Sequence, residues 1–259
     1  PLLSDYLNDR IEAAEFHENM TFWHNYKQDY RPLVELAREE NLHLEGTNIP
    51  KELARKVAYQ GLSVVDTLPD SLRKFLPRWP IPQPDSLNGY QQFYQMFGGH
   101  HGHHGHQHGE QAKSQDEAAI QGKEHAQKPE QHHQEQEEAP TPEKKEDGKM
   151  KHAHGSMKVE NLIQAQMLKD ATMAWYTNRM LGRTETVVHL NGNYHSDNHE
   201  GIVWYLKHYA EIQPEPRPDL RILTLHTRDG DPTREYLPAD ERGVADYILI
   251  TNPRIPKTY

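Results

Sequence analysis

Apolar residues recur at helical spacing through the first part of the chain. Every third or fourth position is apolar over residues 2–16 and again over 25–40, which predicts two helices. A third stripe begins at Pro50 and stops at Gly61, since proline favours the first turn of a helix and glycine the position after its end. An aromatic-rich helix is predicted over 86–97 after a proline-rich loop.

Four short runs between polar or proline-rich stretches are expected to be strands; they lie at 43–47, 186–190, 221–226 and 246–251. The longest helical pattern covers 157–181, and another helix is predicted over 197–209, between the second and third strands. Successive strands joined through a helix pair in parallel. The pattern therefore predicts an α/β fold with a mostly parallel sheet flanked by helices.

Polar residues are concentrated in one segment, 98–155. It holds 11 of the 19 histidines and few large apolar side chains, so it has little apolar surface to bury against the entropy of ordering. We therefore expect a long disordered His-rich insertion. It would divide an α/β domain into an N-terminal part, residues 1–97, and a C-terminal part, residues 156–259.

Composition argues against several classes of function. The net charge is −10, which disfavours a nucleic-acid-binding protein. The sequence has no apolar run of the length needed to span a membrane. It also has no cysteine, so disulfides, iron–sulfur clusters and thiol catalysis are excluded for this sequence.

The first part of the insertion is crowded with histidine, at His100, His101, His103, His104, His106 and His108. Imidazoles at this density bind Zn²⁺, Cu²⁺ or Ni²⁺ without a fixed fold, and protonation of the imidazoles at about pH 6.5 competes with metal binding. The alternative is a solvated linker whose composition has drifted.

The segment VVHLNGNYHSDNHEG, residues 187–201, lies between an expected strand and an expected helix. Ligand sites of open parallel sheets form at such junctions. Gly192 is expected to let the backbone turn sharply, and Tyr194, His195 and His199 offer a phenol and two imidazoles, which are ligands of iron and haem iron. The alternative is that His195 only caps the helix or bonds a backbone carbonyl.

Further candidates lie on other elements. Gln166 and Asp170 are one turn apart on the helix predicted over 157–181, where a carboxylate beside an apolar stripe is unfavourable unless it is paired. We expect Asp170 to accept a hydrogen bond from an imidazole such as that of His195, and we expect Asp170 and Gln166 together to orient His195 and Tyr194. A solvated rim position or a bond to a neighbouring loop is the alternative. Asn48 is either a helix N-cap or an amide that faces the site.

Several segments resemble the ChaN family of haem-binding uptake proteins, within the Tiki, TraB and erythromycin-esterase-like group; they are DYRPLVELA (29–37), TNIPKELA (47–54), AQMLKDATMA (165–174), VVHLNGNYHSDNHEG (187–201) and ADYILIT (245–251). Gly192 and His195 match the second of two GxxH-type motifs of that group. The first, GExH-like motif is absent, and we expect it upstream of Pro1, together with a lipid anchor.

The resemblance implies a haem-binding protein of the bacterial cell envelope, in iron uptake or storage. It also implies a homodimer that holds haem between its subunits through a tyrosine. We assign that role to Tyr194 and expect Tyr194 and His195 to supply or surround the axial position; the other tyrosines considered for the role, Tyr205 and Tyr209, lie on the following helix. Two alternatives remain: a metal-dependent hydrolase of the Tiki type, and a buffer of divalent metals that works through the insertion. A binding protein is favoured over an enzyme.

Overall fold

The computed structural model describes residues 2–98, 157–213, 216–231, 233 and 238–254. These residues belong to one compact unit, which the insertion interrupts in the sequence. The predicted insertion, with its six clustered histidines, lies outside the described residues except for Gly98.

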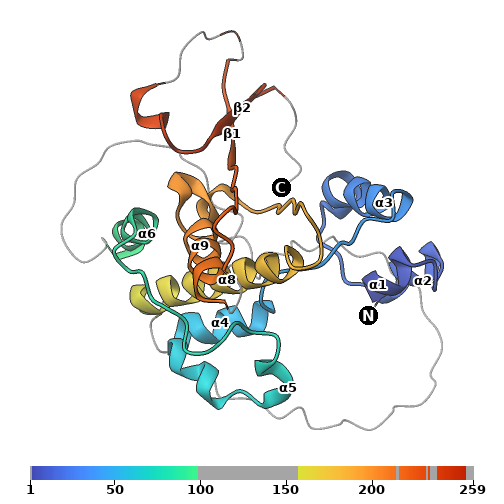
Figure 1. The fold of residues 1–259 in the computed structure, drawn as a ribbon, viewed down its shortest axis with the longest axis horizontal. Helices are drawn as coiled ribbons and strands as arrows, with labels where there is room; N and C mark the ends of the chain where they lie inside the picture. The colour runs from blue at the N-terminus through green and yellow to red at the C-terminus, as the bar shows by residue number, and fades with distance from the viewer. Residues whose placement is uncertain (1, 99–156, 214–215, 232, 234–237, 255–259) are drawn as a thin grey trace, which may run out of the picture. The chain divides into compact units, whose positions relative to one another are not determined.

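The core is built around α8, Val159–Met180 (Figure 1). This helix packs against α4, Lys51–Gln60, against α6, Asn88–Gly98, and against α9, Ile202–Ile212. The consecutive runs 165–168 and 170–174 are buried, so α8 is covered on all sides. Its predicted extent, 157–181, is confirmed within two residues at each end.

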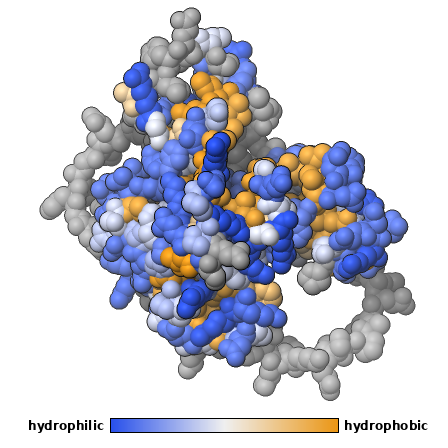
Figure 2. Space-filling view, in the orientation of Figure 1, coloured by the Kyte–Doolittle hydropathy of each residue, from blue (hydrophilic) through white to orange (hydrophobic). Residues whose placement is uncertain are grey.

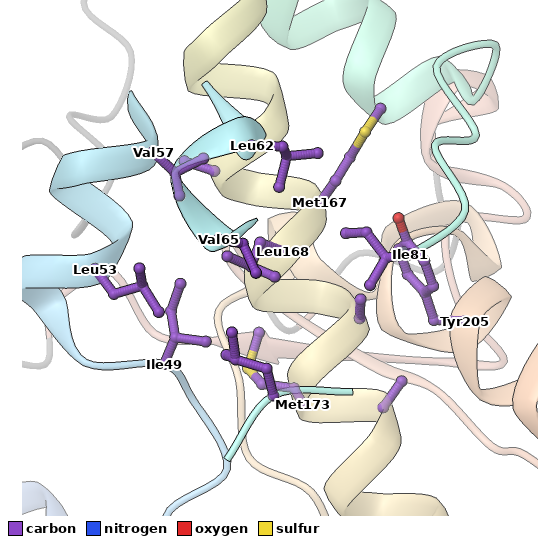
Figure 3. Packing of buried hydrophobic residues seen from close by; sticks show 14 of the residues in the cluster. Ile49, Leu53, Val57, Leu62, Val65, Ile81, Met167, Leu168, Met173 and Tyr205 are labelled. Atoms are coloured by element: carbon purple, nitrogen blue, oxygen red, sulfur yellow. The ribbon is translucent and has the colours of Figure 1, made fainter. Parts of the chain in front are cut away.

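The helix α4 follows the predicted stripe and supplies one wall of the core. It buries Leu53, Val57 and Ala58, and Leu62 and Val65 in the turn that follows α4 lie next to α8 (Figure 3). The helix ends where expected, because Gly61 adopts φ +83° and its N–H donates to the carbonyl oxygen of Val57 at 2.7 Å. Between this turn and α6 the chain is largely irregular, as predicted, apart from the single turn α5, Asp70–Arg73.

The N-terminal helices form a second, smaller cluster. The single helix predicted over 2–16 is wrong: the chain makes α1, Leu2–Leu7, and α2, Ala13–Asn19, with a turn between them. The rings of Tyr6 and Phe16 stack with centroids 4.4 Å apart. A continuous helix would separate these positions by about 15 Å along its axis, so the break is what brings the rings together. The helix predicted over 25–40 is present as the π-helical turn Tyr26–Tyr30 and α3, Arg31–Glu39.

The sheet is a parallel pair, β1, Leu225–Asp229, and β2, Tyr247–Thr251, with Leu225 opposite Tyr247. The α/β class is therefore confirmed. The connection from β1 to β2 contains the short 3₁₀ turn Ala239–Glu241 and, within the described residues, no α-helix. One face of the pair is open, because Leu225, Tyr247 and Leu249 are each more than half exposed, and Figure 2 shows hydrophobic residues at the surface in this region.

Two predicted strands, 43–47 and 186–190, are wrong as strands. Both stretches lack strand structure, because neither forms a backbone ladder with another described segment. They meet instead through side chains, since Thr47 Oγ1 lies 2.9 Å from His189 Nε2. The helix predicted over 197–209 begins later, at Ile202, because residues 193–199 form two 3₁₀ turns.

None of the described helices is both long enough and apolar enough to cross a membrane.

Candidate functional site

The motif 187–201 forms a tightly constrained loop in front of α9. Two 3₁₀ turns, Asn193–His195 and Asp197–His199, are separated by Ser196 alone, and Asn198 and His199 both have φ of +58°. The left-handed region is unfavourable for residues with a Cβ atom. The loop therefore holds a conformation that its own backbone preferences oppose.

The glycine that this loop needs is Gly201, not Gly192. Gly201 adopts φ +52° and ψ −118°, and a Cβ atom there would lie 2.5 Å from the carbonyl oxygen of His195. Gly192 has φ −67° and ψ +147°, which any residue adopts, and a Cβ atom would come only within 4.0 Å of His195 Cδ2. The expectation that Gly192 makes a sharp turn is wrong.

A buried hydrogen-bonded cluster joins the loop to α8. Asp170 is fully buried, and its Oδ1 lies 2.5 Å from His195 Nδ1, while the Tyr90 hydroxyl donates to its Oδ2 at 2.7 Å. The amide end of Gln166 lies 2.9 Å from the same imidazole nitrogen. The predicted contacts of Asp170 and Gln166 with His195 are thus present. The pairing explains how the core accommodates a carboxylate.

Tyr90, on α6, was not among the sequence candidates. Burial, followed by the charge of Asp170, raises the pKa of its phenol, so Tyr90 stays protonated and donates to that carboxylate. Its only signal in the sequence is its place in an aromatic helix. That position alone does not distinguish a polar contact of the hydroxyl from packing of the ring.

Glu200 holds the first turn of α6 and was also missed. Its carboxylate accepts the backbone N–H groups of Asn88 at 3.0 Å and Gly89 at 2.6 Å. An acidic side chain at the first turn of a helix satisfies donors that have no partner within the helix. The motif therefore positions α6 as well as α9. The sequence places Glu200 directly after the candidate His199, but it does not reveal the partner of Glu200, Asn88, which is more than 100 residues away.

A hollow of about 200 Å³ lies between α6 and the loop, lined among others by Tyr90, Phe93, Gln166, Tyr194 and Glu200. Tyr194 stands at its rim, 47% exposed, with its hydroxyl 4.0 Å from Met96 Sδ on α6. Burial, followed by the charge of Asp197, raises the pKa of the Tyr194 phenol. The hollow thus combines one accessible phenol with an aromatic and polar wall.

Of the sequence candidates, only Tyr194 and Gln166 line this hollow; Gly192, His195 and Asp170, described above, do not, and neither do the three that follow. Tyr205 is fully buried and donates its hydroxyl to the carbonyl oxygen of Pro82 at 2.7 Å. His199 Nε2 lies 3.1 Å from Asp246 Oδ2. Asn48 is exposed, and its side-chain oxygen accepts the N–H of Ile49; the N-cap position of α4 is Pro50, so Asn48 does not cap that helix.

Within the residues that the structure describes, no three or more His, Asp or Glu side chains gather as a metal-binding group. The histidines at 100–108, predicted to bind metal, lie outside these residues.

Comparison with known proteins identifies a family but no individual relative. The model of the family described as haem-binding uptake, Tiki superfamily, ChaN matches residues 1–206. The match includes Asp170 and the whole motif loop, whereas β1 and β2 lie beyond it. No curated protein and no solved structure matches the chain significantly. The chain belongs to the ChaN family of haem-binding uptake proteins in the Tiki superfamily.

Proposed function

We propose that this chain binds haem at the mouth of the hollow, with Tyr194 as the residue that ligates the iron. The family description supports haem binding for uptake. The observation that carries the choice of residue is the half-exposed phenol of Tyr194, held at the rim by a loop of fixed conformation. Tyr205 and Tyr209, the two tyrosines of α9, both have buried side chains.

The size of the hollow decides where a porphyrin fits. Pockets that enclose ligands of drug-like size measure roughly 300–1,000 Å³, and this hollow measures about 200 Å³. The porphyrin would therefore lie across the mouth rather than inside. The exposed side chain of Met96 on α6 offers apolar surface beside Tyr194, and Phe93 on the same helix lines the hollow.

A phenolate is an established ligand of ferric haem iron, and the bound iron would supply the positive charge that favours it. Because the pKa of Tyr194 is raised in the free protein, its phenol carries a proton before binding. His195 has a different role in this proposal. Its ring is buried against Asp170 and Gln166, so we assign it to holding the loop rather than to ligating iron.

Titration of the purified protein with hemin tests the proposal. We expect a shifted Soret band in the wild type and its loss in Tyr194→Phe, which removes the phenol oxygen and keeps the ring. Tyr59→Phe is the matched control, because Tyr59 is similarly exposed on α4. A Tyr194→Phe protein that binds hemin as the wild type does would place the iron ligand elsewhere.

A second variant separates the insertion from the hollow. Replacing His100, His101, His103, His104, His106 and His108 with glutamine in the full chain removes the clustered imidazoles. We expect hemin binding through Tyr194 to persist in this variant. Loss of hemin binding in this variant, with hemin binding of Tyr194→Phe unaffected, would show that the insertion is the segment that binds haem. Loss of Zn²⁺, Cu²⁺ or Ni²⁺ binding in this variant would favour the separate alternative, a buffer of divalent metals.

We further propose that the protein acts in iron uptake or storage in the bacterial cell envelope, as a homodimer. The family resemblance supports this proposal, and cell fractionation and the mass of the hemin-loaded protein test it. The competing function is a metal-dependent hydrolase. The His195–Asp170 pair suits a general base, but the described residues assemble no metal-binding group beside it.

A further inference from the structure

The loop that carries Tyr194 is bonded to a distant part of the chain, the segment from Thr224 to Asp246. Asn193 donates from its side-chain amide to the carbonyl oxygen of Thr227 at 2.8 Å. The backbone N–H of Asn198 donates to the carbonyl oxygen of Val244 at 2.7 Å. These bonds flank Tyr194 on both sides in the sequence.

Two histidine–aspartate pairs reinforce the same contact. His226 Nδ1 on β1 lies 2.8 Å from Asp197 Oδ1, and His199 Nε2 lies 3.1 Å from Asp246 Oδ2. The Asp246 carboxylate is itself fixed, because its Oδ2 also accepts the N–H of Thr224 at 2.7 Å and the Thr224 hydroxyl at 2.9 Å. Each pair therefore links the loop to a strand or to the residue before one.

The loop needs such external support. Asn198, which lies between the two paired loop residues, and His199, which belongs to one of the pairs, are both in the left-handed region, which is uncommon for residues with a Cβ atom. A backbone conformation of this kind persists where the surrounding structure enforces it. The bonds to Val244 and Asp246 act on these two residues directly.

We propose that His226 and Asp246 are positioning residues for Tyr194: by holding the loop against β1 and β2, they fix where the phenol stands at the mouth of the hollow. Neither residue is among those that line the hollow. Both lie beyond the part of the chain that the family model matches. The inference rests on the proposed function, since it makes haem affinity depend on these two residues.

Two measurements on the full chain test this inference. Hydrogen exchange followed by mass spectrometry reports on the loop amides at 193–199 without any haem, and hemin titration reports on the phenol. In Asp246→Ala we expect faster exchange at 193–199 with unchanged exchange in α8. Hemin affinity should fall by about tenfold, within the range typical of coupling between sites, and the absorption band of the tyrosinate-ligated iron should shift.

Three variants make these results specific. Asp246→Asn should retain most of the affinity, because its amide oxygen can still accept the bonds from Thr224. Asp219→Ala, at an exposed aspartate before β1, should behave as the wild type. Should Asp246→Ala fail to fold, His226→Gln tests the other pair in the same way.

The inference is overturned if exchange at 193–199 stays at the wild-type rate in both Asp246→Ala and His226→Gln. It is also overturned if exchange accelerates while hemin affinity and the absorption band remain those of the wild type, since that result assigns the pairs to stability alone. Failure of the proposed function is distinguishable, because it shows in the wild type itself as an absence of hemin binding.

Discussion

A Cβ atom on Gly201 would lie 2.5 Å from the carbonyl oxygen of His195, and the backbone of Gly201 is in a region that only glycine adopts readily. We therefore predict that Gly201→Ala lowers the free energy of unfolding by roughly 2–4 kcal/mol, through backbone strain and the displacement of His195. Chemical denaturation monitored by circular dichroism measures this change.

Gly46→Ala is the matched control for that substitution. No atom lies within 4 Å of a Cβ built at Gly46, and its backbone is outside the left-handed region. We expect its effect to stay within about 0.5 kcal/mol. Equal effects of the two substitutions would show that the turn at Gly201 accommodates a side chain.

The carboxylate of Asp170 is the shared partner of Tyr90 and His195 in the core. Asp170→Ala leaves both without it, and we predict a loss of roughly 2–4 kcal/mol in the free energy of unfolding. Tyr90→Phe removes only one donor to the carboxylate and should cost about 1–3 kcal/mol.

The double variant Asp170→Ala, Tyr90→Phe sharpens this prediction. Its destabilisation should be smaller than the sum of the single effects, because the residues share one hydrogen bond. Asp219→Ala is again the exposed control. Additive effects in thermal denaturation would mean that the two side chains act independently.

The Glu200 carboxylate holds the first turn of α6 through the backbone N–H groups of Asn88 and Gly89. We predict that Glu200→Ala increases hydrogen exchange in residues 88–98 while exchange in α8 changes little, because α6 loses its link to the motif loop. Glu185→Ala, at an exposed glutamate, should leave α6 unchanged. Unchanged exchange in Glu200→Ala would show that the hydrogen bond of Tyr90 to Asp170 and the packing of α6 against α8 hold this helix without Glu200.

Local patterns predicted much of the fold because they concern neighbours in the sequence. The apolar stripes of α4 and α8 and the glycine at the end of α4 follow from helical spacing and backbone conformation. The break in the helix expected over 2–16 does not follow from such local patterns, since it accompanies the stacking of Tyr6 on Phe16, a tertiary contact. The strands at 43–47 and 186–190 failed for a similar reason: a strand is defined by its partner.

In the candidate site, too, some contacts could be predicted from the sequence and others depend on residues that are far apart in the chain. The approach of Asp170 and Gln166 to His195 was predictable, because a lone carboxylate on an apolar helix face requires a partner and the motif offered an imidazole. The positions of Tyr90 and Glu200 were not, because Tyr90 is 80 residues from its partner Asp170 and Glu200 is 112 residues from its partner Asn88. The glycine that shapes the loop was misassigned, since spacing within GxxH does not report backbone angles.

His189 gives a prediction for the pH dependence of stability. Burial lowers its pKa, with a smaller contribution from the nearby His195, and the bond to Asn191 opposes the shift only in part. Its ring contacts suit a neutral imidazole, because Nδ1 can donate to the Asn191 side-chain oxygen at 3.0 Å while Nε2 accepts from the Thr47 hydroxyl at 2.9 Å. The folded protein therefore resists protonation at this position.

The sign of the effect follows from proton binding in the two states. Well above about pH 6.5, the ordinary pKa of histidine, neither state protonates His189 and it contributes no pH dependence. Below that pH the unfolded chain binds a proton that the folded chain does not, so the free energy of unfolding falls as the pH falls. The fall from this group ends once the pH drops below the lowered pKa of the folded state.

Comparison of His189→Gln with the wild type isolates this contribution from that of the other histidines. Glutamine retains a donor and an acceptor but has no ionisation, so we expect it to lose less stability than the wild type between pH 7.5 and 5.5, conditions about one unit either side of the ordinary histidine pKa. His24→Gln, at an exposed histidine, should follow the wild-type curve. A His189→Gln curve parallel to that of the wild type would mean that His189 titrates equally in both states, and that its burial beside Thr47 and Asn191 does not disfavour the charged ring.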